Sequence, residues 1–232
     1  MARQPVSKKH PETGLAVGHG HENLRLRPKA ASLIAECIAA WSEVEFHMGR
    51  LLATMLHADS EPTIALYFTL ANERAKREAM FAIGEFTLSA KDRDLFQLIM
   101  KAKESASKHR TALAHGLYCL VADEPDGIGW ISTKDRIKHW SEAHNAEKTL
   151  GYANHSSVRE FIGVYTLDDL TAILDEIIAV SYVIIHLNLY LSPDTGHYLD
   201  EELYLQLSNS PLVTKFQSQI DGNRKNDPSG HE

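Results

Sequence analysis

The residues best suited to chemistry lie in one short stretch of the chain, residues 108–116, with the sequence KHRTALAHG. Arg110 is followed, after four residues, by His115. An arginine guanidinium stays charged and presents a planar set of donors that matches phosphate oxygens. A histidine titrates near neutral pH, so it can remove or deliver a proton under working conditions. The pair therefore suits RNA cleavage by the neighbouring 2′-hydroxyl, which needs proton transfer and charge stabilisation but no metal.

The spacing of the pair limits how the two side chains can meet. Five positions along an ideal helix correspond to about 140° of rotation, so Arg110 and His115 do not share a helix face. They converge if the helix frays at Gly116, or if two copies of the chain face each other across a two-fold axis. The alternative is that Arg110 is a solvated helix residue and His115 is a cation that favours the negative end of the helix dipole.

Further polar residues are candidates to support this pair. Thr111 follows the arginine directly, and Lys103 lies seven residues before it, on the same predicted helix face. Basic side chains can follow a nucleic-acid backbone, although an ordinary solvated charged surface has the same composition. The candidate RNA-binding residues are Lys103, Lys108, Arg74, Lys76 and Arg77.

Long amphipathic helices are expected to position these residues. The segment 29–57 has apolar side chains at alternating spacings of three and four, which is typical of a helix. The segment 61–89 is expected to be helical with a break near Asn72, a plausible N-cap. A third helix is predicted over 92–115, ended by Gly116. The apolar positions of the first helix are Ile34, Cys37, Trp41, Val44, Met48, Leu51 and Met55.

The pattern then changes to that of strands. The segments 117–122 and 128–132 flank a Pro-Asp-Gly turn and predict a hairpin, and 158–165 is a candidate third strand. Thr166 and Asp169 form a capping signature that begins a last helix, which ends at Ser192-Pro193.

The sequence thus predicts a mainly α fold, an antiparallel bundle of about four long helices with a small β-hairpin insert before the last helix. The bundle is expected over 29–191 and the insert over 117–165. Residues 1–28 are expected to form a flexible basic tail, and 192–232 a C-terminal extension whose last dozen residues are disordered. The expected core includes Trp41, Met48, Ile99 and Ile177.

The composition of the chain argues against several classes of protein. The 232 residues carry 24 basic and 31 acidic side chains, a net charge of −7, which argues against wrapping duplex nucleic acid by bulk charge. The chain has two cysteines and no glycine-rich nucleotide-binding loop, so we expect neither a metal site nor a cofactor.

The apolar stretch 177–191 has 15 residues, fewer than the roughly 20 that span a membrane. We therefore expect a buried helix, with a membrane-associated protein as a minor alternative. No secretory signal precedes it, and a cytoplasmic location is expected.

The arginine-x4-histidine pattern, followed by glycine at the end of the third helix, resembles the HEPN superfamily of small helical bundles. The resemblance extends over roughly 29–191. It implies a homodimer with a composite cleft and, in many members, metal-independent endoribonuclease activity in toxin, antiphage or RNA-processing systems. It also implies that Glu45, on the first helix, orients Arg110, although Glu45 equally suits a position flanking the apolar stripe. Members that cleave RNA usually have Asn, Asp or His after the arginine, where this chain has Thr111.

Two functions follow from these observations. The first is an endoribonuclease in which Arg110 holds the scissile phosphate and His115 transfers the proton. The second is a non-catalytic HEPN-like dimeric module that binds RNA, a nucleotide or a protein partner, and the acidic net charge and Thr111 favour it. A toxin of this kind would have an antitoxin or a nucleotidyltransferase as its partner.

Overall fold

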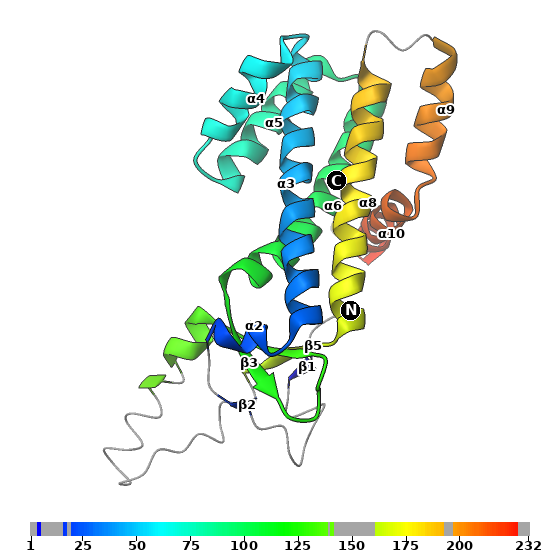
Figure 1. The fold of residues 1–232 in the computed structure, drawn as a ribbon. Coiled ribbons are helices and arrows are strands. Elements are labelled where there is room, and N and C mark those ends of the chain that lie inside the picture. Colours follow the sequence, from blue (N-terminus) through cyan, green and yellow to red (C-terminus); the bar gives the residue numbers. More distant parts are fainter. Residues whose placement is uncertain are drawn as a thin grey trace. The chain divides into compact units, whose positions relative to one another are not determined.

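The computed structural model describes residues 4–5, 16–17, 20–138, 140–141, 161–192 and 197–226 of the chain. In these residues the fold is mainly helical with a small antiparallel sheet, as Figure 1 shows. The chain divides into two compact units. The first comprises Met1–Ala39 and Lys108–Asp175, and the second comprises Ala40–Ser107 and Glu176–Glu232.

The first unit is built around the sheet, in which neighbouring strands are antiparallel and the order is β1-β5-β4-β3-β2. Strands β3 (Gly116–Val121) and β4 (Ile128–Ser132) confirm the predicted hairpin, and β5 (Gly163–Tyr165) confirms the third strand in a shorter form. Part of the predicted insert, 142–160, lies outside the described residues. One side of the sheet packs a small core of Cys119, Val121, Ile131, Ile162 and Val164.

The N-terminal segment contributes to this sheet, which corrects the prediction of a flexible tail for its described residues. The two-residue strand β1 (Gln4–Pro5) pairs with β5, and β2 (Ala16–Val17) pairs with β3. A short helix, α2 (Glu22–Arg25), follows. The Gly20 amide and the Asn23 side chain both donate to the Tyr118 carbonyl, at 3.1 and 2.9 Å. These contacts are formed by backbone groups and one amide, so apolar periodicity gives no sign of them.

The second unit consists of helices, and the predicted helices are confirmed. They are α3 (Pro28–Leu56), α4 (Ser60–Thr69), α5 (Glu73–Thr87), α6 (Ala90–His115) and α8 (Leu167–Leu191), of which α3, α6 and α8 contribute residues to both units. Side-chain hydrogen bonds join them, with Thr54 donating to Asn188 at 2.6 Å and Tyr190 donating to Asp92 at 2.7 Å. The expected core residues are all buried, namely Trp41, Met48, Ile99 and Ile177.

The predicted helix starts are also confirmed. Asn72 lies between α4 and α5, and its side chain accepts a hydrogen bond from the Ala75 amide at 2.9 Å, as an N-cap does. At the start of α8 the Asp169 amide donates to the Thr166 hydroxyl at 3.1 Å, and the Thr166 amide donates to the Asp169 carboxylate at 3.0 Å. This reciprocal arrangement is a capping box.

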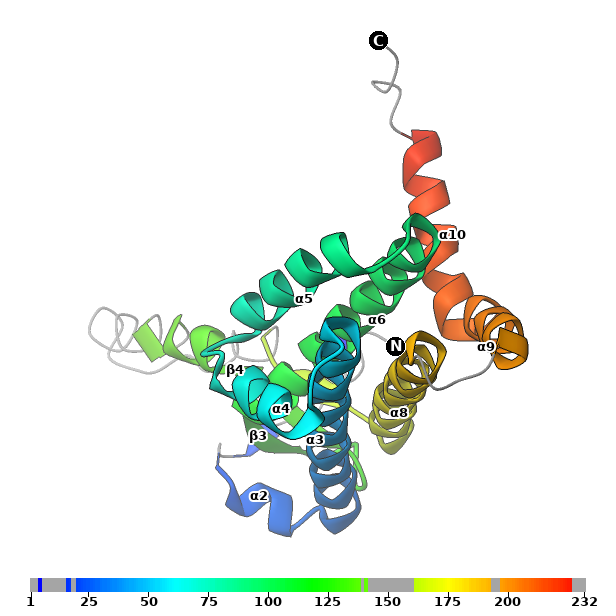
Figure 2. The same ribbon diagram turned by 90° about the horizontal axis from the view of Figure 1, so that it is seen from above.

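The described part of the C-terminal extension is helical, which corrects the prediction of disorder for residues 221–226. Helices α9 (His197–Ser208) and α10 (Pro211–Asn226) follow α8, so α10 occupies half of the dozen residues expected to be disordered, and 227–232 lie outside the described residues. Figures 1 and 2 both show α9 beside α8, where the rings of Tyr190 and Tyr204 lie 5.8 Å apart. The described chain therefore has more helices than the four or so predicted. Among the residues of α9 and α10 whose side chains are described, the buried apolar ones are Leu207, Val213 and Phe216.

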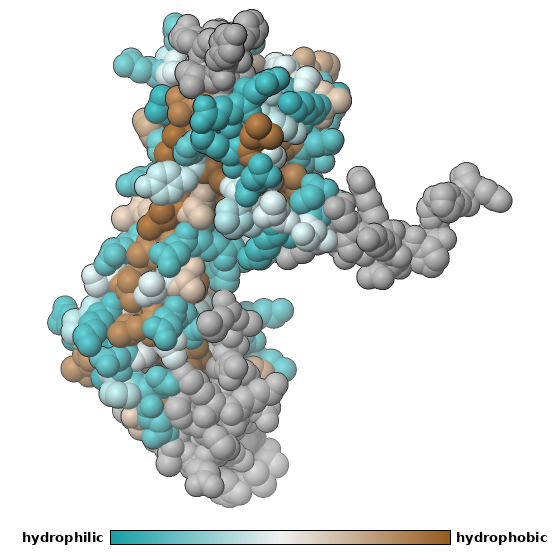
Figure 3. All heavy atoms as spheres, turned by 90° about the vertical axis from the view of Figure 1, so that its right-hand side faces the viewer, coloured by the Kyte–Doolittle hydropathy of each residue, from teal (hydrophilic) through white to brown (hydrophobic). Residues whose placement is uncertain are grey.

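Helix α8 is the one helix in the described part of the chain that is long and apolar enough to cross a membrane by length and composition. It has 25 residues, which is longer than the apolar stretch expected from the sequence, and 44% of its most apolar part is buried inside the molecule. Buried core helices meet the same criterion. On the face that Figure 3 shows, apolar side chains lie among polar ones.

Candidate functional site

The arginine–histidine pair lies at the C-terminal end of α6, in the first unit. The helix is regular as far as His115, and β3 begins at Gly116. The fraying that would bring the two side chains together in one chain is therefore not observed. Arg110 is half-buried, whereas Thr111 and His115 are exposed.

Side chains from the sheet and the segment after it hold this helix end in place. The carbonyls of the last turn have no partner within a helix and need donors from elsewhere. The Trp130 indole donates to the Ala112 carbonyl at 2.7 Å, and the Tyr118 hydroxyl donates to the Leu113 carbonyl. The Thr133 hydroxyl donates to the His115 carbonyl at 3.2 Å. Three of these carbonyls thus have partners, which opposes unwinding of the turn that carries His115.

Gly116 is required for a reason that the sequence did not reveal. It does follow the helix, as predicted, but its backbone does not adopt the left-handed conformation of a glycine cap. The Trp130 ring lies so close to it that a Cβ atom at this position would be 1.5 Å from the indole nitrogen. The glycine therefore makes room for the indole that caps α6.

We expect Gly116→Ala to lower the free energy of unfolding by about 1–3 kcal/mol. The added methyl group would displace Trp130 and break the hydrogen bond between its indole and the Ala112 carbonyl, so both buried polar groups would lose their partner. Urea titration followed by circular dichroism measures this loss. The matched control is Gly20→Ala, because a Cβ atom at Gly20 meets no atom within 4 Å. Equal stability of the Gly116 and Gly20 variants would contradict the proposed role of the glycine.

Arg110 and His115 are not committed to other groups. Within the described part of the chain the Arg110 side chain forms no ion pair, and its buried Nε atom has no hydrogen-bond partner. The imidazole of His115 likewise makes no hydrogen bond to a described residue, since only its carbonyl is used. Both groups can therefore interact with a ligand without first breaking an internal contact.

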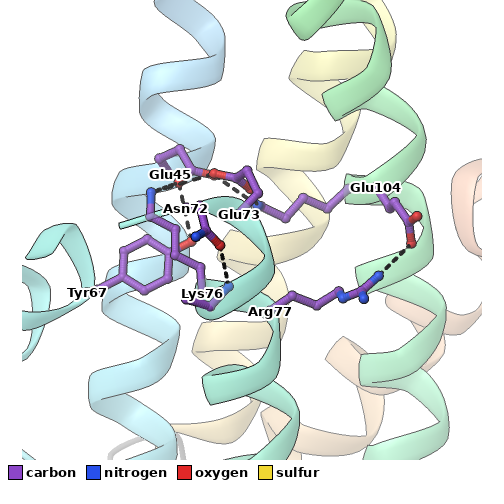
Figure 4. Close-up of polar contacts among 9 residues, drawn as sticks. Glu45, Tyr67, Asn72, Glu73, Lys76, Arg77 and Glu104 are labelled. Atoms are coloured by element: carbon purple, nitrogen blue, oxygen red, sulfur yellow. Dashed lines mark hydrogen bonds and ion pairs between the residues drawn. The ribbon is translucent and has the colours of Figure 1, made fainter. Parts of the chain in front are cut away.

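Glu45 belongs to a different cluster, in the second unit. Its carboxylate accepts a hydrogen bond from Lys76 and lies 2.9 Å from the Lys103 nitrogen. Glu73 completes the arrangement, at 2.8 Å from Lys103 and 3.6 Å from Lys76. The Tyr67 hydroxyl donates to Glu45 at 3.4 Å. Figure 4 shows Glu45 of α3, Tyr67 of α4, and Glu73 and Lys76 of α5 gathered in this cluster.

This cluster is electrically balanced and buried except for Glu73, whose side chain is half exposed. Glu45 and Lys103 are each 6% exposed, and two carboxylates alternate with two ammonium groups. Burial alone would raise the pKa of Glu45, but the charge of Lys103 and the hydrogen bonds from both lysines lower it, and the net direction is downward. Burial, with the charge of Glu45, raises the pKa of Tyr67, which therefore stays protonated. The cluster joins four helices, and Glu45 and Lys103 carry its buried charges.

The predicted RNA-binding residues consequently differ in what they can do. Lys76 and Lys103 pair with carboxylates of this cluster, and Glu45 contacts these two lysines and Tyr67. The orientation of Arg110 by Glu45 stays a prediction. Arg74 pairs with Glu78 at 2.6 Å and Arg77 pairs with Glu104 at 3.6 Å. Lys108 alone among the five is exposed and has no carboxylate partner among the described residues.

The sequence analysis missed a group of exposed residues after β4. Residues 133–138 are helical, and the segment 133–141 carries Lys134, Arg136, Lys138 and an exposed Trp140. Basic residues alternating with an aromatic residue are a recognisable signal of nucleic-acid binding. The signal was overlooked because the stretch has no apolar periodicity.

The two cysteines do not add chemistry to the site. Burial raises the pKa of Cys119 to about 12, and burial together with the charge of Glu36 raises the pKa of Cys37 to about 11. Both are buried thiols, so Cys119 serves in packing, as predicted.

Comparison with known proteins gives no assignment. No protein-family model matches the chain, and neither a curated protein nor a solved structure is significantly similar to it.

Proposed function

We propose that this chain is a HEPN-like protein that acts as a metal-independent endoribonuclease, in a toxin, antiphage or RNA-processing role. The observation that carries the proposal is the contrast among its basic side chains. Arg110 and His115 have no internal partner in the described part of the chain, whereas Arg74, Lys76, Arg77 and Lys103 are each paired with a carboxylate. An arginine and a histidine that have no partner among the described residues are suited to binding and acting on a phosphodiester once a second copy of the chain brings them together.

The proposed reaction uses the two side chains in different roles. The His115 imidazole accepts the proton of the 2′-hydroxyl as its oxygen attacks the adjacent phosphate, and a protonated imidazole delivers a proton to the departing 5′-oxygen. The Arg110 guanidinium neutralises the charge that develops on the phosphate oxygens. The products are a 2′,3′-cyclic phosphate and a free 5′-hydroxyl.

We further propose that the site is completed by a second copy of the chain. On the regular helix, Arg110 and His115 are separated by about 140° and by about 7.5 Å along the axis. The capped helix end opposes the unwinding that would bring them together. A two-fold homodimer, the commonest closed assembly, places the arginine of one protomer opposite the histidine of its partner.

The alternative function is a non-catalytic HEPN-like dimeric module that binds RNA, a nucleotide or a protein partner. The net charge of −7 and the threonine after Arg110 favour it. The remaining parts of the proposal are an antiparallel arrangement of the long helices over 29–191, a cytoplasmic location, and an antitoxin or nucleotidyltransferase as partner of a toxin.

The test is an assay of a mixed RNA pool with EDTA present. The wild-type protein should cleave, because the chemistry needs no divalent ion, and the new 3′ ends should carry a 2′,3′-cyclic phosphate. His115→Ala should cleave far less, and light scattering should give twice the 25.9 kDa chain mass for both proteins. Equal cleavage by the two proteins, or none by either, would favour the binding module.

A further inference from the structure

The segment after β4 presents an unusual surface for so small an element. Residues 133–138 are helical, and in Figures 1 and 2 they are drawn in light green. Two large apolar side chains of this segment are exposed, Ile137 at 62% and Trp140 at 66%. An indole that is two-thirds exposed adds little to a core and leaves a large aromatic face open to a ligand.

The charges around the indole are mostly positive. The described residues of 133–141 include three cations, Lys134, Arg136 and Lys138, and one carboxylate, Asp135. An Asp135 oxygen accepts a hydrogen bond from the Ser132 hydroxyl at 2.6 Å. The Asp135 amide donates to the same hydroxyl at 3.0 Å, so Asp135 is used at the helix start. Neither Lys134 nor Arg136 is paired with a carboxylate among the described residues.

The cations are arranged on aromatic rings. The Arg136 guanidinium lies 5.8 Å from the Trp140 ring centroid, and the Lys138 nitrogen lies 5.4 Å from that of Phe161. A guanidinium beside an exposed indole offers one planar surface on which a base can stack and a charge for the phosphate next to it. A folded peptide partner would not require this concentration of positive charge.

The segment is connected to the arginine–histidine pair within the first unit. Thr133, at its first position, donates to the carbonyl of His115 at 3.2 Å. A strand bound along the segment therefore ends next to the helix end that carries the motif.

We propose that Trp140, Arg136 and Lys134 form a binding site for single-stranded RNA. An unpaired base stacks on the Trp140 indole, and the two cations contact the phosphates on either side of it. Stacking of this kind tolerates any base but requires that the base be unpaired, so the site prefers single strands to duplex. The inference goes beyond the proposed function, since the site binds RNA whether or not Arg110 and His115 cleave it.

The experiment measures binding of a fluorescein-labelled, 12-nucleotide single-stranded RNA by anisotropy, in the His115→Ala background so that the probe stays intact. Trp140→Ala should weaken binding by about 5- to 150-fold, the usual value of one stacked base. Trp140→Phe should retain most of the affinity, because it keeps an aromatic face. Circular dichroism should show all variants folded, since the side chain is exposed.

The matched control is Phe86→Ala. Phe86 is 92% exposed and belongs to the second unit, so its loss removes an equally accessible aromatic ring from elsewhere in the chain. The Phe86→Ala variant should bind the RNA with the same affinity as the parent protein. Arg136→Gln should reduce the dependence of log Kd on log salt by about 0.7, the value for one phosphate contact on a single strand.

Tryptophan emission provides an independent readout. The chain has three tryptophans, and Trp41 and Trp130 are only 4% and 7% exposed. Quenching of the emission by added RNA therefore reports stacking on Trp140 and should disappear in Trp140→Phe. The inference is overturned if the parent protein does not bind the RNA, if Trp140→Ala binds as tightly, or if a duplex binds equally well. Trp140-dependent binding by a wild-type protein that does not cleave would overturn only the proposed catalysis.

Discussion

Replacing His115 by alanine should lower the rate of RNA cleavage by about 10²–10⁴-fold, the usual value of general acid–base catalysis by a positioned side chain. Arg110→Ala should lower it by about 10²–10³-fold, by analogy with the loss of a donor to a developing oxyanion. Arg110→Lys should recover little of this, because lysine keeps the charge but loses the planar set of donors. Single-turnover cleavage of a labelled RNA measures these rates. Thr111→Asn should raise the wild-type rate if the residue after the arginine limits catalysis.

Mixing the two inactive variants tests the composite site directly. In a mixed dimer of Arg110→Ala and His115→Ala, one composite site lacks both side chains and the other retains both. Random exchange makes half of the dimers mixed, so about a quarter of wild-type activity should return. A site formed within one chain would give no recovery on mixing. In the control, each variant is mixed with an equal amount of the same variant, and the rate of RNA cleavage should not change.

Glu45→Ala should lower the free energy of unfolding by about 3–5 kcal/mol. The change leaves Lys103, which is 6% exposed, buried with only Glu73 opposite it, and breaking a buried ion pair from one side costs about this much. Urea denaturation measures the loss. Glu43→Ala is the matched control, because Glu43 lies on the same helix and is exposed, and its effect should stay within about 0.5 kcal/mol. A loss below about 1 kcal/mol for Glu45→Ala would contradict the role assigned to the cluster.

The same cluster predicts how stability depends on pH. The pKa of Glu45 is lower in the folded protein than in the unfolded chain, so its contribution is complete above the unfolded pKa of about 4.3. As the pH falls through the lowered pKa, the native carboxylate binds a proton and the contribution is lost. The Glu45→Gln variant should therefore show a weaker loss of stability on acidification than the wild-type protein. Parallel pH profiles for the two proteins would show that Glu45 does not contribute in this way.

The long helices were predictable because their burial repeats along the sequence. The apolar stripes are buried as expected, with Trp41 and Met48 on α3 and Ile99 on α6. The same stripes also contain charged residues that indicate a buried ion pair. Glu45 lies four residues after Trp41, and Lys103 lies four after Ile99, so each is a charge within an apolar face. Opposite charges in two buried stripes indicate an ion pair between the helices, not a surface for RNA.

Other features could not be found from periodicity, because they depend on contacts between distant segments. The need for glycine at 116 arises from a tryptophan fourteen positions later that lies over it. The strands β1 and β2 have two residues each, too few for any pattern. Helix α10 begins at a proline, and the polar composition of its second half predicted disorder. Its buried residues with described side chains, Val213 and Phe216, lie in the first half. The positions of the paired charges, and the lack of a carboxylate partner for Arg110 among the described residues, follow only from three-dimensional contacts.

The order of strands in the sheet has a consequence for how the chain folds during its synthesis. Gln4 pairs with Val164, so one edge of the sheet joins residues 160 positions apart, whereas the β3–β4 hairpin is local. At typical translation rates of 5–20 residues per second, the first strand waits about 10–30 s for its partner to be made. The hairpin and α3 can form in that time, while β1 cannot. We therefore expect β1 to be accessible to proteases on the ribosome until Tyr165 has emerged, and to join the sheet after the hairpin has formed.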